Sequence, residues 1–398
     1  MLIFEKPFTQ QESIPEEGIE RAVEILRSGR LHRYNLSPDE SGEVALLEQD
    51  YATWQERDYC IATTSGGTAI QLALRAAGVE AGDLVLANAY TLAPVPGAIY
   101  NVGAKALLVE IDHNYHMDLD DFEAKAKRSG AKYLLLSHMR GHIGDMPAIM
   151  KIAEDHNITV IEDCAHTMGA RYHGIRSGNY GHVAAFSTQT YKHINSGEGG
   201  LLTTNDPLIA AKATIMSGSY MLYERHGAGP TAEVFEEIRT KMPNFSCRLD
   251  HVRAALIRAQ LPNLDQNIAR WNTLYQRLDQ GLRQISGISL PQRPQAEFYV
   301  GSSMQFRVDT LDADDIPHFL AACGKRGVEL KWFGADRPVA FTSRYDSWDY
   351  LGEQPDLPAT KTALDKTIDM RVPLTFDEAD CTIITDIIKD VLASDFNA

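Results

Sequence analysis

Residues 131–163, AKYLLLSHMRGHIGDMPAIMKIAEDHNITVIED, contain the pattern from which the fold follows. Two short apolar runs, AKYLLLSH and ITVIED, flank the segment AIMKIAEDHN, in which apolar residues recur with helical period. A strand, a helix and a second strand in this order predict two parallel strands joined by a crossover helix. The same alternation continues outward in both directions, from about residue 59 to residue 205.

Four further apolar runs predict additional strands of the same sheet. They are DLVLANA at 83–89, KALLVEID at 105–112, HVAAFS at 182–187 and GLLTTND at 200–206. Segments of helical period such as TAIQLALRAAG lie between them. The predicted fold class is therefore α/β, with a large domain in which helices flank a mostly parallel sheet.

Both ends of the chain are predicted to add elements outside this sheet. Ser13 and Glu16 are spaced as a capping box, and we expect an N-terminal helix over about 13–28 that stops at Gly29. Residues 249–282 predict one or two long helices, after which apolar runs and a helix near 314–327 predict a smaller C-terminal α/β domain. We predict a large domain over 1–255, with linking helices and the small domain over 256–398.

Composition excludes several classes of protein. The 398 residues include 54 acidic and 38 basic side chains, and the net charge of −16 disfavours binding to nucleic acid or to an anionic membrane. The five cysteines are scattered and form no C-x-x-C pair, so we expect no disulfide framework and no metal site. No apolar run approaches the roughly 20 residues of a membrane span, and we expect a cytoplasmic protein.

One aspartate ends a predicted strand. Asp163 closes the run VIED, and ligands of open parallel sheets usually lie at the carboxyl ends of the strands. A buried carboxylate at such a place can keep the ring nitrogen of pyridoxal phosphate protonated, as the electron-sink chemistry of that cofactor requires. His166 follows three residues later, within reach of the ring hydroxyl.

A glycine-rich helix start and a lysine complete the pattern. Ser65, Gly66, Gly67 and Thr68 precede a predicted helix whose free N–H groups can hold one phosphate. In FSTQTYKHINSGEGG, residues 186–200, a partly desolvated Lys192 can attack a carbonyl, and Ser187 adds a hydroxyl for the phosphate. Each feature alone has a structural explanation, as a solvated charge, a helix cap or a strand end; together they predict a pyridoxal phosphate site.

Three blocks of the sequence resemble the pyridoxal-phosphate-dependent aminotransferases of the DegT/StrS group, most of which aminate keto-sugars. The blocks are 65–112, 160–206 and CRLDHVRAALIRAQLPNLD at 247–265. The resemblance implies an aspartate-aminotransferase-like fold, fold type I of these enzymes, with Lys192 as the Schiff-base lysine and Asp163 on the pyridine nitrogen. It further implies His166 beside the ring hydroxyl, and phosphate contacts from Gly67, Thr68 and Ser187.

The resemblance also implies a homodimer with shared active sites. Arg248 stands near the position from which family members reach the neighbour's phosphate, although Ser246 replaces a common asparagine. Leu92 stands where an aromatic residue usually packs on the pyridine ring, so either Leu92 or Tyr90 serves there. His193 follows the lysine where asparagine is common.

Two groups of residues are candidates for substrate binding. In GRLHRYN, four side chains can form an anion-binding rim or a solvated basic patch: Arg30, His32, Arg33 and Tyr34. Four others occupy positions near the substrate of the family: Arg140, His142, Lys331 and Trp332.

These observations predict an aminotransferase that moves an amino group from glutamate or glutamine to a keto-sugar, nucleotide-linked or acidic, in amino-sugar biosynthesis. Relatives that are dehydratases commonly replace the lysine by histidine, so Lys192 favours transamination. The alternatives are the same chemistry on a cyclitol ketone or another small carbonyl compound, and a non-catalytic regulator that binds pyridoxal phosphate. The acidic composition counts against a regulator that binds DNA.

Overall fold

A seven-stranded sheet forms the centre of the large half of the protein in the computed structural model, which describes residues 2–37 and 40–396. The strands are, in spatial order, β1 (Tyr59–Thr63), β9 (Gly200–Thr204), β8 (Val183–Ser187), β5 (Thr159–Asp163), β4 (Tyr133–Ser137), β2 (Leu84–Asn88) and β3 (Lys105–Val109). Strand β9 runs antiparallel to both neighbours, and the other adjacent pairs are parallel. The mostly parallel sheet predicted from the sequence is confirmed.

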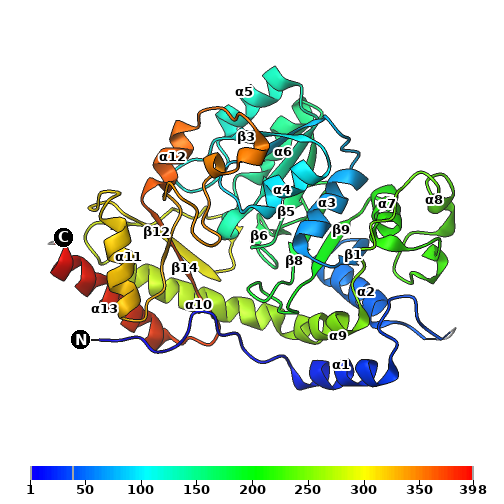
Figure 1. Ribbon diagram of the computed structural model, residues 1–398, viewed down its shortest axis with the longest axis horizontal. Coiled ribbons are helices and arrows are strands. Elements are labelled where there is room, and N and C mark those ends of the chain that lie inside the picture. The colour runs from blue at the N-terminus through cyan, green and yellow to red at the C-terminus, as the bar shows by residue number, and fades with distance from the viewer. Residues whose placement is uncertain (1, 38–39, 397–398) are drawn as a thin grey trace.

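Helices cover both faces of this sheet (Figure 1). The helices of the large half are α2 (Glu43–Gln55), α3 (Gly66–Ala76), α4 (Pro94–Asn101), α5 (Leu119–Ser129), α6 (Met146–Asp155), α7 (Pro207–Gly218), α8 (Ala232–Glu236) and α9 (His251–Gln260). Successive strand residues alternate between two apolar clusters: Val160 packs with α2, α5 and α6, and Ile161 packs with α3, α4 and α7. The strands read as continuous apolar runs because both faces are buried.

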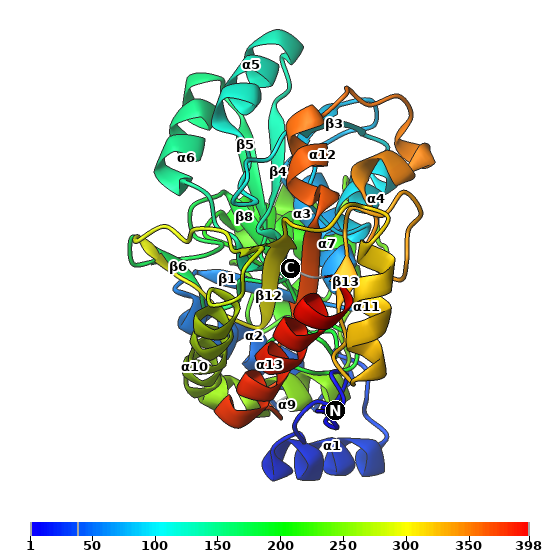
Figure 2. The ribbon, with the colours of Figure 1, turned by 90° about the vertical axis from the view of Figure 1, so that its left-hand side faces the viewer.

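A second, antiparallel sheet follows the long helix α10 (Leu264–Leu282). Its strands are β10 (Ile288–Ser289), β12 (Ser303–Val308), β14 (Thr367–Arg371) and β13 (Lys331–Trp332), and its helices are α11 (Ile316–Lys325), α12 (Pro358–Asp365) and α13 (Glu378–Asp395). Figure 2 shows α10, α11 and α13 grouped beside β12. Phe306 and Met370 lie in the apolar cluster between this sheet and the helices. A three-stranded sheet of β11 (Glu297–Phe298), β6 (Arg171–Tyr172) and β7 (Ile175–Arg176) joins the two halves of the sequence.

The N-terminal segment differs from the expectation in two ways. Helix α1 (Glu16–Ser28) ends at Gly29, which has φ 70°, but it starts three residues later than predicted, and Ser13 does not cap it. Pro15 occupies the N-cap position because a proline disfavours helical geometry in the residue before it. Residues before α1 pack with the second half of the chain, where Phe4 and Phe8 each meet the ring of Phe376 at 5.0 Å. The domain boundary at 255/256 stays a prediction.

Within the described residues, none of the helices combines the length and the apolar character needed to span a bilayer. All five cysteines are buried and free.

Candidate active site

Asp163 lies at the carboxyl end of β5 and is 5% exposed. One carboxylate oxygen, Oδ2, accepts a hydrogen bond of 2.8 Å from Ser137 Oγ, and the other accepts one of 3.1 Å from the backbone N–H of Ala165. Ser137 ends the adjacent strand β4, and its Oγ accepts a hydrogen bond of 2.8 Å from Thr91 Oγ1. The parallel register therefore supplies the groups that orient this carboxylate.

Lys192 lies in the turn between β8 and β9, and its Nζ is 2.8 Å from Nε2 of His166. Burial lowers the pKa of the amine to about 7, helped by the charges of Arg140 and Arg371 and opposed by Asp163. Burial, and then the charge of Lys192, hold the pKa of His166 well below its ordinary value. A substantial fraction of the amine is therefore neutral near pH 7, the form that attacks a carbonyl.

Helix α3 begins beside this turn. Ser65 is its N-cap and accepts a hydrogen bond of 3.1 Å from the backbone N–H of Thr68. A Cβ added at Gly66 would lie 2.7 Å from Ser187 Cβ, and one added at Gly200 would overlap the carbonyl of Ser65. These glycines let the start of α3 lie directly against β8 and β9, which brings a helix N-terminus and the Ser187 hydroxyl to one place.

Pyridoxal phosphate fits this set of donors. The helix N-terminus with Gly67, Thr68 and Ser187 suits a phosphate, while the lysine of lowered pKa and the buried carboxylate of Asp163 suit a carbonyl and a pyridine nitrogen. Leu92 is partly buried and has surface left for a ligand, whereas Tyr90 is 1% exposed and packs against Tyr115 and Phe333. Of the two candidates for the ring contact, Leu92 is the accessible one.

The contacts of Arg248 with the described residues do not include Lys192. Its Nη1 donates a hydrogen bond of 3.0 Å to the carbonyl of Gly218, and its guanidinium lies 5.0 Å from the ring of Tyr220. The role of Arg248 toward a neighbouring subunit stays a prediction.

The structure does not bring the GRLHRYN residues to one rim. Arg33 is buried and donates two hydrogen bonds of 2.6 Å to the carboxylate of Glu48 in α2, and the hydroxyl of Tyr34 meets Nδ1 of His226 at 3.1 Å. Arg30 is paired with Glu40. His32 remains accessible at the surface. Arg33 and Tyr34 are thus occupied inside the protein, and an anion-binding rim would rest on Arg30 and His32.

Arg140 and His142 are joined by a buried network to the second sheet. Arg140 Nη2 donates to Asp369 Oδ2 at 2.8 Å, Gln305 Nε2 donates to Asp369 Oδ1 at 2.8 Å, and Gln305 Oε1 meets His142 Nε2 at 2.8 Å. Lys331 is on β13, with Asp369 opposite it on β14. The charge of Arg140 lowers the pKa of Lys192, whereas His142 is bonded to Gln305 within the network.

Trp332 is turned to a different partner, because its Nε1 donates to the carbonyl of Asp365 at 2.6 Å.

A cavity of about 370 Å³ adjoins Lys192 and His193. Arg270 and Gln11 contribute to its mostly polar wall. No local pattern in the sequence predicts this cavity, because residues far apart in the chain form it.

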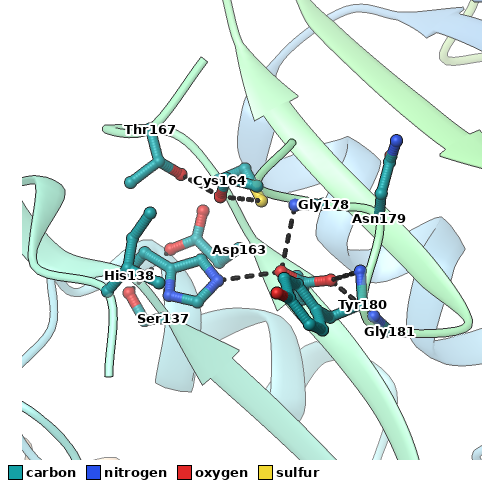
Figure 3. Close-up of polar contacts among 12 residues, drawn as sticks. Ser137, His138, Asp163, Cys164, Thr167, Gly178, Asn179, Tyr180 and Gly181 are labelled. Carbon is teal, nitrogen blue, oxygen red and sulfur yellow. Dashed lines mark hydrogen bonds and ion pairs between the residues drawn. The ribbon is translucent and has the colours of Figure 1, made fainter. Parts of the chain in front are cut away.

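Hydrogen bonds hold a loop in place behind the site, and Figure 3 labels His138, Gly178, Tyr180 and Gly181 among the residues involved. Glu162 accepts hydrogen bonds from His138 Nε2 at 2.9 Å and from the backbone N–H groups of Gly178, Tyr180 and Gly181. Ligand atoms of His138, Glu162 and Cys164 lie within 4.8 Å of one another. Both carboxylate oxygens are already used, and burial raises the pKa of the Cys164 thiol well above its ordinary value. The group has the character of a structural clamp beside Asp163.

Comparison with known proteins defines the class. The model of the DegT/DnrJ/EryC1/StrS aminotransferase family matches residues 12–389. The chain is 31% identical over 340 residues to a dTDP-3-amino-3,4,6-trideoxy-alpha-D-glucose transaminase of Streptomyces venezuelae, covering 83% of this chain and 79% of that protein. It is 32% identical over 261 residues to a pleiotropic regulatory protein of Geobacillus stearothermophilus, covering 65% of this chain and 64% of that one.

The fold agrees with this class. The crystal structure of 3-amino-5-hydroxybenzoic acid synthase superposes with a TM-score of 0.84, over 98% of this chain and 99% of that one, at 23% identity. The chain belongs to the DegT/DnrJ/EryC1/StrS aminotransferase family. Membership confirms the predicted resemblance, the α/β fold class and an aminotransferase that depends on pyridoxal phosphate.

Proposed function

We propose that the protein transfers an amino group from glutamate or glutamine to a keto-sugar, in the biosynthesis of an amino sugar. The observation that carries this proposal is the partly buried amine of Lys192, whose pKa is lowered to about 7, beside a strand-end carboxylate and a helix N-terminus. The transaminase of Streptomyces venezuelae, which acts on a dTDP-linked sugar according to its name, supports a nucleotide-linked acceptor.

Pyridoxal phosphate, when bound, supplies an electron sink for the negative charge that develops on a carbon losing its proton. Asp163 would hold the proton on the pyridine nitrogen, because its carboxylate is buried and oriented by Ser137. Gly67, Thr68 and Ser187 would bind the phosphate, and Leu92 would pack on the ring. Arg248 would reach the phosphate of a second copy in a homodimer.

Lys192 would hold the cofactor and then move a proton. Its Nζ would accept the proton from the α-carbon of the amino donor and hold it for delivery later in the same half-reaction. His166, whose low pKa keeps it neutral, would orient this amine and lie beside the ring hydroxyl. The same groups act in reverse order when the keto-sugar enters.

The experiment that tests the proposal follows the absorption spectrum of the purified protein with glutamate and with glutamine, then reduces it with borohydride and maps the modified peptide. We expect a yellow protein that bleaches with the donor and carries the adduct on Lys192. Lys192→Ala should keep its fold by circular dichroism and lose both responses, while a change of the exposed Lys105 to Ala should keep them. A colourless protein that takes up no cofactor would refute the proposal.

A second candidate is a regulator that binds pyridoxal phosphate without turnover, and the name of the Geobacillus relative favours it. A protein that binds the cofactor on Lys192 but never bleaches with any amino donor would support this second candidate.

Incubation with keto-sugars and with keto-cyclitols, followed by analysis of products, separates the two acceptor classes. We also propose a cytoplasmic homodimer, which sedimentation of the purified protein and fractionation of cells test.

A further inference from the structure

The second sheet presents a polar face toward the site. Residues of β14 alternate, so that Ile368 and Met370 lie in the apolar cluster under α11 and α13, while Asp369 and Arg371 point to the opposite side. Opposite them in the register stand Gln305 and Ser303 on β12, and Lys331 on β13 pairs with Asp369. This face therefore carries three cationic side chains, Arg371, Lys331 and Arg307, around one carboxylate. Arg307 already donates hydrogen bonds to the carbonyls of Thr362 and Ala363.

The carboxylate on this face, Asp369, already accepts hydrogen bonds within the protein. Both oxygens of Asp369 are engaged, one by Arg140 at 2.8 Å and the other by Gln305 at 2.8 Å. Arg371 and Lys331 form no ion pair and no side-chain hydrogen bond with any of residues 2–37 and 40–396. An arginine that is partly buried and lacks an anionic partner is unusual in a folded protein.

A contact with Tyr191 and an electrostatic effect on Lys192 place Arg371 near Lys192. Its guanidinium carbon lies 3.8 Å from the ring centroid of Tyr191, the residue directly before the lysine. Burial, and then the charge of Arg140, lower the pKa of Arg371 to about 10, and the charge of Arg371 in turn lowers the pKa of Lys192. The two arginines and the lysine thus converge, although each comes from a different segment of the chain.

Arg140 also has a hydrogen-bond donor that is free for a ligand. It is 9% exposed, and its Nε is buried without a hydrogen-bond partner among the described residues. A buried donor without a partner costs about 1–3 kcal/mol, more when it is charged, unless a ligand or water satisfies it. The backbone at Arg140 has φ 54°, a left-handed conformation that residues other than glycine rarely adopt. This conformation costs free energy, so the surrounding structure must hold Arg140 in place.

We propose that Arg371, with Arg140 and Lys331 beside it, forms a carboxylate-binding subsite for the substrate that enters next to Lys192. This inference rests on the proposed function and deepens it. The carboxylate of an amino donor is bonded to the same α-carbon whose proton Lys192 removes, so it must lie within two bonds of the reacting atom. An acidic keto-sugar would present the same group. The planar fork of arginine matches a carboxylate with two parallel hydrogen bonds.

The test uses the cofactor-loaded protein and three variants: Arg371→Gln, Arg371→Lys and, as the control, Arg277→Gln. Arg277 is exposed on α10 and bonds only Thr382 among the described residues, so its loss should change nothing. Binding of glutarate, a dicarboxylate without an amino group, is measured by calorimetry. We expect Arg371→Gln to weaken it about 10- to 100-fold, and Arg371→Lys to weaken it less, because the charge remains while the fork is lost.

Two kinetic arms then distinguish the source of the carboxylate. If the donor supplies it, Arg371→Gln weakens the apparent affinity for glutamate in a single half-reaction while the limiting rate changes little. If the acceptor supplies it, the KM for a keto-sugar that carries a carboxylate rises, and the KM for a neutral keto-sugar does not. Either result supports the subsite.

Unchanged glutarate binding together with unchanged constants for donor and acidic acceptor would overturn the subsite while leaving the proposed function intact. Glutarate binding that depends on Arg371 in a protein that aminates no acceptor would instead support the subsite and refute the proposed function. The calorimetric arm does not depend on turnover, so the two failures remain separable.

Discussion

Nζ of Lys192 lies 2.8 Å from Nε2 of His166, a contact between an amine and an imidazole that are both held away from their charged forms. Neither group repels the other when both are neutral, and a neutral imidazole can accept a hydrogen bond from the amine. The pair therefore keeps a partly buried lysine reactive, with an imidazole and not a carboxylate as the hydrogen-bond partner of its amine.

The first prediction concerns the pH at which Lys192 reacts. Because its pKa is lowered to about 7, from an ordinary lysine value of 10.5, the neutral fraction should rise as the pH increases through about 7. We expect the rate of carbamoylation of Lys192 by cyanate, in protein stripped of cofactor, to increase through this range and to level off above it. Quantitative peptide mapping measures the rate, and the exposed Lys105 in the same digest serves as the internal reference. A rate that keeps rising to pH 10 would contradict the lowered pKa.

The second prediction concerns Glu48, which Arg33 and His226 meet in the interior at 2.6 Å and 3.2 Å. Burial alone would raise the pKa of this carboxyl, but the charges of Arg33 and His226 outweigh burial and lower it to about 2. Since the unfolded value is 4.5, the stability from this group is complete above pH 4.5 and is lost as the pH falls through about 2.

Glu48→Gln should therefore reduce the free energy of unfolding at pH 7 by about 3–5 kcal/mol, because it leaves the Arg33 charge buried and unpaired. The difference from the wild type should narrow as the pH is lowered from 4.5 toward 2, as urea unfolding at several pH values would show. Glu24→Gln is the matched control, because Glu24 pairs with Arg21 at the surface and the change should cost at most about 1 kcal/mol. Equal effects of the two changes would count against the buried pair.

The origin of this pair shows what the sequence could and could not predict. The sheet was predictable because its strands are local apolar runs, and Asp163 and Lys192 were found because each lies in a recognisable local segment. The basic residues around Arg33 predict an anion-binding rim or a solvated patch, and only the three-dimensional fold brings Glu48 of α2 to Arg33 in the interior. Arg371 had no local signal at all, since it is distinguished by its register on β14 and by its lack of a partner.

The third prediction concerns the hydrogen bonds that orient Asp163. Ser137→Ala removes a bond of 2.8 Å to a buried carboxylate, and we expect a loss of about 1.5–3 kcal/mol in stability. Thr91→Val removes only the neutral bond from Thr91 to Ser137, and we expect about 0.5–1.5 kcal/mol.

The functional readout is the rate of the half-reaction with the amino donor, which should fall about 10-fold in Ser137→Ala and less in Thr91→Val. If both variants lose stability but keep the wild-type rate, Ser137 supports the fold without positioning Asp163.

The last prediction concerns the contact between α3 and β9. A Cβ at Gly200 would overlap the carbonyl of Ser65, which is backbone at the N-cap and cannot move without displacing the start of α3. Gly200→Ala should therefore lower the free energy of unfolding by about 1–3 kcal/mol and weaken the binding of pyridoxal phosphate, because the N–H groups of α3 shift away from Ser187. Gly97→Ala is the matched control, since Gly97 lies in α4 with no atom within 4 Å of the added Cβ, and alanine there should stabilise the helix by about 0.5–1 kcal/mol. Thermal unfolding and a spectroscopic titration with the cofactor measure both effects. Wild-type cofactor affinity in Gly200→Ala, with stability reduced, would show that the start of α3 does not hold the phosphate.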